Sequence, residues 1–255
     1  MTAAEEQVLE VVQSWGAVRI LGPLEGGNRN TALLVELNGE SVVAKTTRRS
    51  EASLRWLHPV LERAERAGFV VPRLLPDLSG RFVVNGVTVE TFLQGERFPR
   101  AELGIVGPII RRFHLSTRGL TQRPGFRSTL ELVAHDRGGD VDLNEMPEGL
   151  AQACREAWRQ LRGSPVSVVH GDLNPDNLLL VNGDDVGLVD WDEARVDVSL
   201  LDEAALAWAG ASGNGAHSPA QRALLAWELA ASWRIEPEYS RKLSEEFMKS
   251  IGDAR

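Results

Sequence analysis

Residues 166–194 read VSVVHGDLNPDNLLLVNGDDVGLVDWDEA and contain two short apolar runs, 166–169 and 186–189. The length and valine content of these runs predict two strands. The residues that follow the two runs are mostly polar: His170, Gly171, Asp172 and Asn177 after the first run, and Asp190 after the second. The segment therefore predicts two neighbouring strands that carry hard oxygen ligands and proton acceptors at their ends.

A hairpin is predicted between these polar positions. Residues 178–181 are apolar enough for a strand, and the Asn-Gly-Asp-Asp cluster at 182–185 is a turn signal before the return strand. A tight antiparallel pair of this length places Asn177 and Asp190 opposite each other, with Asp172 just upstream.

Composition limits what this segment can belong to. The chain has 255 residues, of which 43% are apolar and 25% charged, and this is ordinary for one large globular domain or two small ones. The net charge of −8 argues against a general nucleic-acid binder. The acidic start MTAAEEQVLE is unlike a signal peptide, and no apolar run reaches the roughly 18 residues of a membrane span, so a cytoplasmic protein without membrane contact is expected. The single cysteine, Cys154, excludes an internal disulfide and is interpreted as a buried thiol.

The N-terminal part predicts a site for an anion. Residues 24–30 form a turn-rich loop with Gly26, Gly27 and Asn28, and the strands 31–37 and 41–45 follow, joined by an Asn-Gly turn. A glycine loop lets the backbone approach a phosphate, and Lys45 at the end of the hairpin adds a positive charge. Because glycine hairpins that end in a lysine are common, this signal alone is weak.

The remaining elements predict two lobes. Residues 51–67 form a helix that Pro59 is expected to kink or split, and strands are predicted at 69–72 and 81–93. Beyond residue 95 helical patterns dominate, so a small β-rich N-lobe is assigned to residues 1–95 and a larger, mainly helical C-lobe to residues 96–255. The helices of the C-lobe are expected at 101–116, 148–161, 204–209, 220–233 and 239–251. His114 is interpreted as a satisfied core histidine.

Acidic residues gather in two places beyond the lobe boundary. The region 131–148 contains Glu131, Asp136, Asp140, Asp142, Glu145 and Glu148, with Arg137 as its only basic residue. A second group, Asp192, Glu193 and Asp197, follows Asp190. Two interpretations stay open for the first region: a solvated surface, or an acidic wall for a cationic substrate.

Phosphoryl transfer accounts for the residue types at these spacings. The reaction needs a nucleotide held in place, a metal ion against its phosphates and an aligned hydroxyl nucleophile. Asp172 has the character of a base that orients the hydroxyl and takes its proton. Asn177 and Asp190 suit Mg²⁺, which prefers hard oxygen donors and few protein ligands. Lys45 and the glycine loop would hold the phosphates from the other lobe.

Two motifs resemble the paired signature of the aminoglycoside phosphotransferase and choline kinase family, small-molecule relatives of the protein kinases. The first is His170-Gly171-Asp172 with Asn177, and the second is Leu188-Val189-Asp190-Trp191. The resemblance extends to Val42-Val43-Ala44-Lys45, to Gly26-Gly27-Asn28 and to Asp202, which lies where the family has an aspartate that opens a helix behind the active site. It thus covers most of the chain. The loop lacks a complete G-x-G-x-x-G, and the region 122–143 is similar to uncharacterised bacterial members.

The resemblance implies an α+β, two-lobed protein-kinase-like fold and a role for each matched residue. Asp172 is the implied catalytic base and His170 orients the catalytic loop. Asn177 and Asp190 are the implied Mg²⁺ ligands, and Lys45 is the implied contact of the α- and β-phosphates. Glu51 is the implied helix partner of Lys45, ahead of Glu62 and Glu65. Adenine binding is implied for the backbone around Glu90, Phe92 and Leu93.

The expected function is therefore transfer of the γ-phosphoryl group of ATP or GTP to a hydroxyl of a small polar molecule, such as an aminoglycoside or an amino sugar. Because acidic residues are numerous near the expected site, the acceptor is expected to carry a positive charge. The expected partners are a nucleotide and this acceptor, with a monomer or weak dimer as the assembly. Two alternatives remain: a nucleotide-binding module without catalysis, and a metal-dependent hydrolase that uses His170, Asp172 and Asp190.

Overall fold

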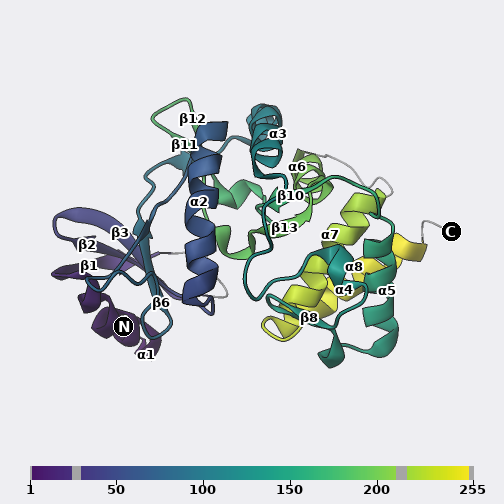
Figure 1. The fold of residues 1–255 in the computed structure, drawn as a ribbon, viewed down its shortest axis with the longest axis horizontal. Coiled ribbons are helices and arrows are strands. Elements are labelled where there is room, and N and C mark those ends of the chain that lie inside the picture. The colour runs from purple at the N-terminus through teal and green to yellow at the C-terminus, as the bar shows by residue number, and fades with distance from the viewer. Residues whose placement is uncertain (1, 25–29, 211–216, 253–255) are drawn as a thin grey trace.

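A computed structural model of the chain describes residues 2–24, 30–210 and 217–252. Figure 1 shows a β-rich part that contains the N-terminus beside a larger part made mainly of helices. We call the first the sheet lobe and the second the helical lobe. The predicted α+β class with a small β-rich lobe and a larger helical lobe is confirmed. Within the described ranges, every helix is too short or too polar to cross a membrane.

The sheet lobe is built on an antiparallel sheet with the strand order β1-β2-β3-β6-β5. Its strands are β1 (Val18–Pro23), β2 (Ala32–Leu37), β3 (Glu40–Thr46), β5 (Leu74–Leu75) and β6 (Val87–Thr91). Asn38 and Gly39 have φ angles of 53° and 89°, the left-handed pair that a two-residue hairpin turn needs. The hairpin predicted around this turn is confirmed, whereas β1 had no predicted counterpart.

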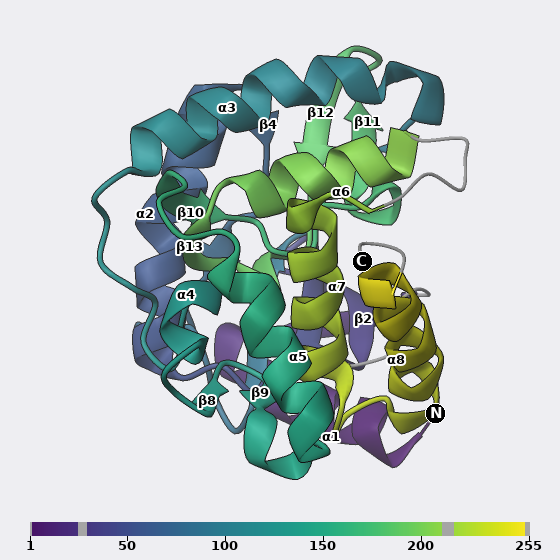
Figure 2. The ribbon, with the colours of Figure 1, turned by 90° about the vertical axis from the view of Figure 1, so that its right-hand side faces the viewer.

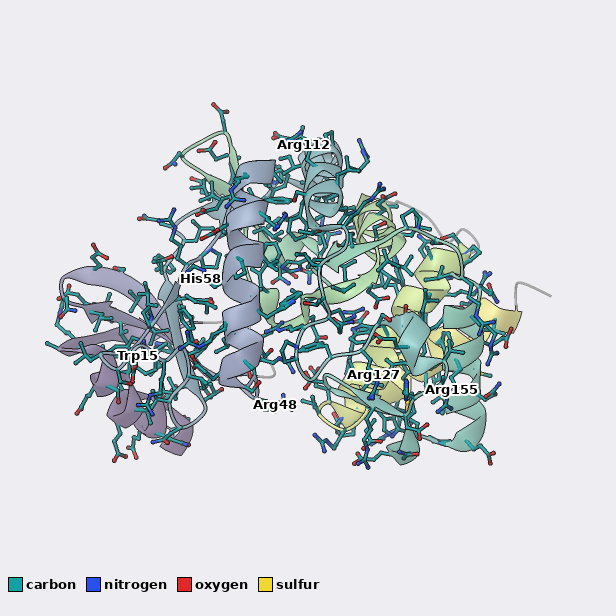
Figure 3. The ribbon with its side chains drawn as sticks, viewed as in Figure 1. Trp15, Arg48, His58, Arg112, Arg127 and Arg155 are labelled. Atoms are coloured by element: carbon teal, nitrogen blue, oxygen red, sulfur yellow. The ribbon has the colours of Figure 1, made fainter. Side chains whose placement is uncertain are left out.

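A short helix covers one face of this sheet. Helix α1 (Ala3–Val12) packs against β3 and β6, with Val8 and Val12 fully buried (Figure 1). The 3-10 turn η1 (Gln13–Trp15) follows it, and Trp15 donates from Nε1 to the Leu75 carbonyl at 2.7 Å (Figure 3). Helix α1 thus closes the core of the sheet lobe. The C-terminal end of β3, which carries Lys45, is left for the site.

Helix α2 (Glu51–Ala67) connects the two lobes. Its start is capped by Ser50, and it ends at Gly68, whose φ of 112° is left-handed. The helix continues without a break through Pro59, so the predicted split does not occur. The buried leucines of α2 contribute about 2 kcal/mol each, which together exceeds the roughly 3 kcal/mol cost of an interior proline. These leucines are Leu54, Leu57 and Leu61.

A second sheet with the order β4-β12-β11-β7 lies beside α2. Its strands are β4 (Phe69–Val70), β7 (Glu96–Arg97), β11 (Leu178–Val181) and β12 (Asp185–Leu188). β11 and β12 pair antiparallel in the register Leu178↔Leu188, which confirms the predicted hairpin. Because this sheet takes strands from both sides of residue 95, the division at that residue stays a prediction.

The first strand of the central segment has a different partner from the one predicted. β10 (Val166–Val169) pairs with β13 (Arg195–Val198), which had no predicted counterpart, and not with β12. The prediction of two neighbouring strands is therefore wrong. The segment folds back on itself twice, because the hairpin of β11 and β12 is inserted between β10 and its partner.

The helical lobe packs around its own core of aliphatic and tryptophan side chains. Its helices are α3 (Val106–Thr117), α4 (Thr129–Leu132), α5 (Glu148–Arg159), α6 (Leu200–Gly210), α7 (Pro219–Ser232) and α8 (Pro237–Gly252). Figure 2 shows α7 between α5 and α8, with α3 and α6 above them. Short elements complete the lobe: η2 (Arg100–Ile105), β8 (Arg137–Gly138), β9 (Val141–Asp142), η3 (Leu143–Glu145), η4 (Pro175–Asn177) and η5 (Trp191–Glu193). Cys154 is buried in α5, and burial raises the pKa of its thiol to about 12, which fits the predicted inert role.

Candidate active site

One cavity of about 1270 Å³ collects side chains from the sheet lobe, the central segment and the helical lobe. The sheet lobe contributes Lys45 and Glu90, and the central segment contributes Asp172, Asn177 and Asp190. Gly26, Gly27 and Asn28 lie outside the described residues. Phe92 and Leu93, predicted to bind adenine, line the same cavity.

The loop after β10 is held from behind by a buried aspartate. Asp202, in the first turn of α6, accepts hydrogen bonds from the backbone N–H of His170 (2.9 Å) and of Gly171 (3.1 Å). The His114 Nε2 lies 2.9 Å from the same carboxylate, so His114 is a buried structural histidine. Burial raises the pKa of Asp202, but the hydrogen bond from His114 and the backbone donors outweigh it and hold the pKa below its usual value.

His170 and Gly171 have distinct structural tasks. His170 is fully buried, and its Nε2 lies 3.0 Å from the Val189 carbonyl, so it joins the loop after β10 to the residue before Asp190. Gly171 has a φ of 85°, and a Cβ there would lie 2.6 Å from the Glu193 carbonyl oxygen. Only glycine fits this backbone. The contact of His170 with the Val189 carbonyl suits a role in orienting the loop, which stays a prediction.

The Asp172 carboxylate stands at the cavity wall between two asparagines. Asn174 donates from Nδ2 to Oδ1 (2.8 Å), and Asn177 donates from Nδ2 to Oδ2 (2.9 Å). Although Asp172 is open to solvent on one side, burial in the cavity wall raises its pKa, while the nearby His170 and the two amides favour the charged form. The side chain is thereby aimed and kept as a hydrogen-bond acceptor.

The residues predicted to bind Mg²⁺ offer a donor set that fits the ion. Asn177 donates from Nδ2 to the carbonyl and the carboxylate of Asp172, and no donor among the described residues reaches its Oδ1. The Asp190 carboxylate is half exposed to the cavity. Asn177 and Asp190 do not stand directly opposite, since the Asn177 carbonyl pairs with the Val189 N–H at 3.0 Å. Two hard oxygen donors at the edge of a solvent-filled cavity match the few protein ligands that Mg²⁺ takes.

Lys45 is surrounded by carboxylates. Its Nζ lies 3.2 Å from Glu90, 3.7 Å from Asp190 and 3.9 Å from Asp192. Burial lowers the pKa of Lys45, but these carboxylates outweigh it and hold the pKa above its usual value. Burial also raises the pKa of Glu90, against the effect of the ammonium. Lys45 therefore stays charged at neutral pH and is available to a polyphosphate.

The prediction that Glu51 pairs with Lys45 is wrong. Glu51 instead accepts from the backbone N–H of Phe82 (2.9 Å) and Val83 (3.1 Å). Glu90 takes its place because the register pairs Val43 with Glu90, so Glu90 and Lys45 are diagonal neighbours on one face of β3 and β6.

Replacing Glu90 by glutamine is expected to raise the KM for the nucleotide by about tenfold, because Lys45 loses its nearest charged partner and is no longer held in place. The matched variant Glu51→Gln removes a carboxylate that does not contact Lys45. It should leave this KM within about twofold, which is close to the wild-type value. Steady-state kinetics at saturating acceptor checks both. An effect of Glu51→Gln as large as that of Glu90→Gln would contradict the pairing seen here.

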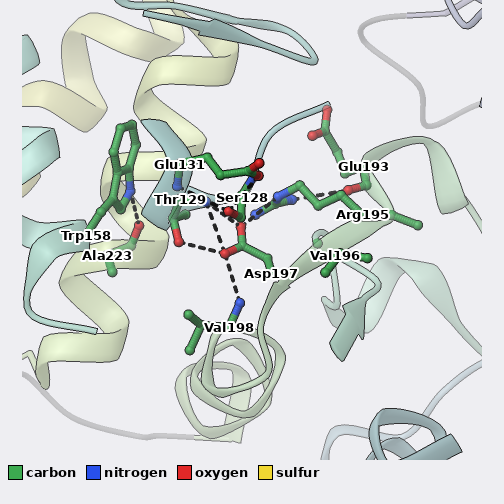
Figure 4. Close-up of polar contacts among 12 residues, drawn as sticks. Ser128, Thr129, Glu131, Trp158, Glu193, Arg195, Val196, Asp197, Val198 and Ala223 are labelled. Atoms are coloured by element: carbon green, nitrogen blue, oxygen red, sulfur yellow. Dashed lines mark hydrogen bonds and ion pairs between the residues drawn. The ribbon is translucent and has the colours of Figure 1, made fainter. Parts of the chain in front are cut away.

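The acidic residues after Asp190 serve three different purposes. Asp192 accepts a hydrogen bond from Asn30 Nδ2 at 3.0 Å and faces Lys45, and the nearby cations lower its pKa despite burial. Glu193 lies 3.5 Å from Arg49. Asp197 is fully buried, and Figure 4 shows Thr129 and Arg195 pointing toward its carboxylate. Asp197 therefore belongs to the core and does not support the cationic acceptor that the acidic residues led us to expect.

The region 131–148 is not an acidic wall. Asp136 pairs with Arg155, Asp142 pairs with Arg137, and Glu131 caps its own helix at Ser128. Of the acidic residues in this region, Asp140 is the one that lines the cavity, where it forms a two-pronged ion pair with Arg49 at 2.8 and 3.1 Å. Sequence reasoning missed Arg49. Its position just after the strand that carries Lys45 was the available signal.

The end of the cavity in the helical lobe combines aromatic and acidic side chains. The aromatic residues are Trp208, Trp227 and Tyr239, and the acidic residues are Glu228, Glu236 and Glu246. They come from α6, α7 and α8 and from the turn before α8. Aromatic faces and carboxylates together attract a cation. Because the Arg195 guanidinium already lies 3.2 Å from the centre of the Trp227 ring, the groups here that suit a bound cation are Trp208, Tyr239 and the glutamates.

The chain was compared with known families and proteins. A family model described as "Phosphotransferase enzyme family" matches residues 21–239. A homoserine kinase from Gluconobacter oxydans (strain 621H) is 26% identical over 201 residues, which are 71% of this chain and 62% of that protein. The chain therefore spans less than two thirds of the length of this relative.

Solved structures with the same fold were also found. The choline kinase LicA from Streptococcus pneumoniae has a TM-score of 0.67 at 14% identity, covering 99% of this chain and 100% of that chain. A thermostable mutant of the aminoglycoside phosphotransferase APH(4)-Ia, in ternary complex with AMP-PNP and hygromycin B, has a TM-score of 0.61 at 17% identity, covering 98% and 99% of the two chains. These similarities establish the protein-kinase-like fold that the motifs predicted.

Proposed function

The chain belongs to the phosphotransferase enzyme family, and we propose that it transfers the γ-phosphoryl group of ATP or GTP to a hydroxyl of a small, cationic acceptor. The observation that carries this proposal is the single cavity in which Lys45 faces Asp190 across the lobes and Asp172 stands beside them. Phosphoryl transfer needs mainly positioning and charge, and this cavity supplies both.

Each residue has a task that its surroundings support. Lys45, charged and buried among carboxylates, would bind the α- and β-phosphates. Asp172, aimed by Asn174 and Asn177, would accept the hydrogen bond of the acceptor hydroxyl. It would take the proton of that hydroxyl as the new P–O bond forms and the bond from the γ-phosphorus to the bridging oxygen breaks, which releases the nucleoside diphosphate. Asn177 and Asp190 would hold Mg²⁺, which supplies charge neutralisation at the phosphates when bound. Phe92 and Leu93 line the place proposed for the adenine.

The proposed acceptor class is supported by the end of the cavity that lies in the helical lobe. Trp208, Tyr239 and Glu246 lie there with the chemistry of a site for a positively charged group. The relatives named above include a homoserine kinase, a choline kinase and an aminoglycoside phosphotransferase. Their named acceptors all carry an amine or ammonium group together with a hydroxyl, which supports an amino alcohol here.

The two alternatives have less support. A hydrolase built on His170 would need that imidazole in the cavity, but its Nε2 is engaged with the Val189 carbonyl and its ring is buried. A non-catalytic module would be expected to lack one of Lys45, Asp172 and Asp190, and all three line the cavity. A cytoplasmic location and a monomer or weak dimer stay predictions.

The test is a phosphorylation assay with Mg-ATP or Mg-GTP and a panel of aminoglycosides, amino sugars, choline and homoserine. One acceptor should gain a phosphoryl group by mass spectrometry. Its neutral isostere, for example 3,3-dimethyl-1-butanol beside choline, should show a kcat/KM at least about tenfold lower, because the cation loses its aromatic and acidic partners. No phosphoryl gain on any acceptor, together with no nucleotide binding by calorimetry, would refute the proposal.

A further inference from the structure

An arginine outside the predicted site reaches the loop that follows Asp190. Arg123 lies in the segment between α3 and α4 and is 1% exposed. Its Nη1 lies 2.9 Å from the carbonyl oxygens of Asp192 and Ala194 and 3.1 Å from that of Trp191. One guanidinium nitrogen thus contacts three backbone carbonyls of the same short loop.

The Trp191 carbonyl also accepts from the Ala194 N–H at 3.2 Å, which closes the single turn η5 (residues 191–193). The carbonyls that follow at the end of such a turn have no partner within it, and Arg123 supplies a donor to those of Asp192 and Ala194. Leaving such a group buried and unpaired costs about 1–3 kcal/mol. Burial lowers the pKa of Arg123 to about 10, so the guanidinium is still charged at neutral pH and its hydrogen bonds are charge-assisted.

Arg123 also makes contacts away from the loop, although its Nη2 has no hydrogen-bond partner among the described residues. Its Nε donates to Ser53 Oγ in α2 at 2.7 Å, and its guanidinium lies 4.7 Å from the centre of the Phe126 ring. The preceding residue, Gln122, accepts from the Val196 N–H (2.9 Å) and donates to the Val196 carbonyl (2.7 Å). The two residues together hold the backbone from η5 to β13.

The functional side chains of this loop contact residues other than Arg123, which contacts its carbonyls. Asp190 has a left-handed backbone with a φ of 61°, and its carboxylate points to Lys45. Asp192 reaches Asn30 and Lys45. A left-handed non-glycine residue costs about 1–2 kcal/mol and persists where its surroundings hold it. The contacts of Arg123 with the adjacent carbonyls are suited to supply that restraint.

We propose that Arg123 is a positioning residue that sets the placement of the Asp190 carboxylate through the backbone of residues 191–194. This inference rests on the proposed function, because it assigns the effect to the affinity for the metal–nucleotide complex. Arg123 contacts neither the nucleotide nor the acceptor in this assignment. It acts as the supporting partner of a metal ligand, a type of residue whose loss typically costs about 10–100-fold in metal affinity.

The test compares Arg123→Lys with Arg112→Lys. Lysine keeps the charge, but it lacks the separate Nε donor by which Ser53 holds Arg123 while Nη1 contacts the three carbonyls. Arg112, labelled in Figure 3, donates to the Ala67 carbonyl at 2.9 Å and makes no hydrogen bond to residues 190–194 within the described part of the chain, so it is the matched control. Calorimetry should show a Kd for Mg-nucleotide at least about tenfold higher in Arg123→Lys, a smaller change in the Kd for nucleotide with EDTA, and wild-type values in Arg112→Lys.

Two further measurements separate positioning from general stability. Hydrogen exchange should rise in peptides that cover residues 189–196 of Arg123→Lys. The milder variant Gln122→Ala, which keeps Arg123, should shift the Mg-nucleotide Kd in the same direction by about two- to fivefold, within the range for supporting residues of a metal ligand. A lower Tm of Arg123→Lys with unchanged Mg-nucleotide affinity would overturn the inference. If the wild-type protein binds no Mg-nucleotide, the proposed function itself fails.

Discussion

Replacing Asp172 by asparagine should lower kcat by about three orders of magnitude, because the amide cannot take the proton of the acceptor hydroxyl. Asparagine has nearly the same size and keeps one oxygen for the contact with Asn177, which now lies 2.9 Å from the carboxylate. The nucleotide contacts at Lys45 are untouched. The Kd for Mg-nucleotide, measured by calorimetry, should therefore stay within about threefold of wild type, since binding and the proton transfer are separate contributions.

The matched control for this variant is Asp176→Asn. Asp176 lies in the same loop, lines the same cavity and pairs with Arg97 at the surface. Exposed ion pairs contribute about 0–1 kcal/mol, so this variant should keep nearly full activity. If Asp172→Asn loses nucleotide affinity instead of turnover, or if both variants lose turnover equally, Asp172 is not the base.

Replacing Asp190 by asparagine should abolish the benefit of Mg²⁺ for nucleotide binding and lower turnover at least about a hundredfold, because a neutral amide oxygen is a much weaker ligand of a hard cation. Asparagine is preferred to alanine here. It tolerates the left-handed φ of 61°, whereas alanine would add about 1 kcal/mol of backbone strain.

Calorimetry with Mg²⁺ and with EDTA provides the measurement for Asp190→Asn. The wild-type Kd for nucleotide should be at least about tenfold lower with Mg²⁺ than with EDTA, and the two values should converge in the variant. Asp184→Asn is the control, since Asp184 lies exposed in the turn of the same hairpin at its opposite end. An unchanged Mg²⁺ dependence in Asp190→Asn would move the metal ligand to another residue.

The elements that were predicted correctly are those with local signals. The hairpins at Asn38 and Asn182 follow from Asn-Gly pairs, and the structure gives both asparagines a positive φ, 53° and 50°. Gly68 ends α2 because glycine readily adopts the left-handed φ, here 112°, that a helix end needs. β13 and its pairing with β10 were missed, because the hairpin of β11 and β12 separates the two strands in the sequence and their pairing depends on contacts between distant residues.

The chemistry of the site was readable because its residues cluster in the sequence. Asp172, Asn177 and Asp190 lie within one hairpin and the loop before it, so their approach to one cavity follows from short connections. Arg49 offered only its position just after the strand that carries Lys45, and Arg123 gave no signal. Each is one arginine among many, and its role depends on which carbonyls or carboxylates the fold brings to it.

The sequence by itself predicted the reaction class and the residues proposed at its centre, because hard oxygen ligands, a base and a lysine at these spacings have few other uses. Only the tertiary structure decided which acidic residues pair with the basic residues of the site and of the core. Register on β3 and β6 brought Glu90 and not Glu51 to Lys45, and burial paired Asp197 with Arg195 in the core. The physical reason is that a buried charge needs a partner, and which partner is in reach is decided by packing and register.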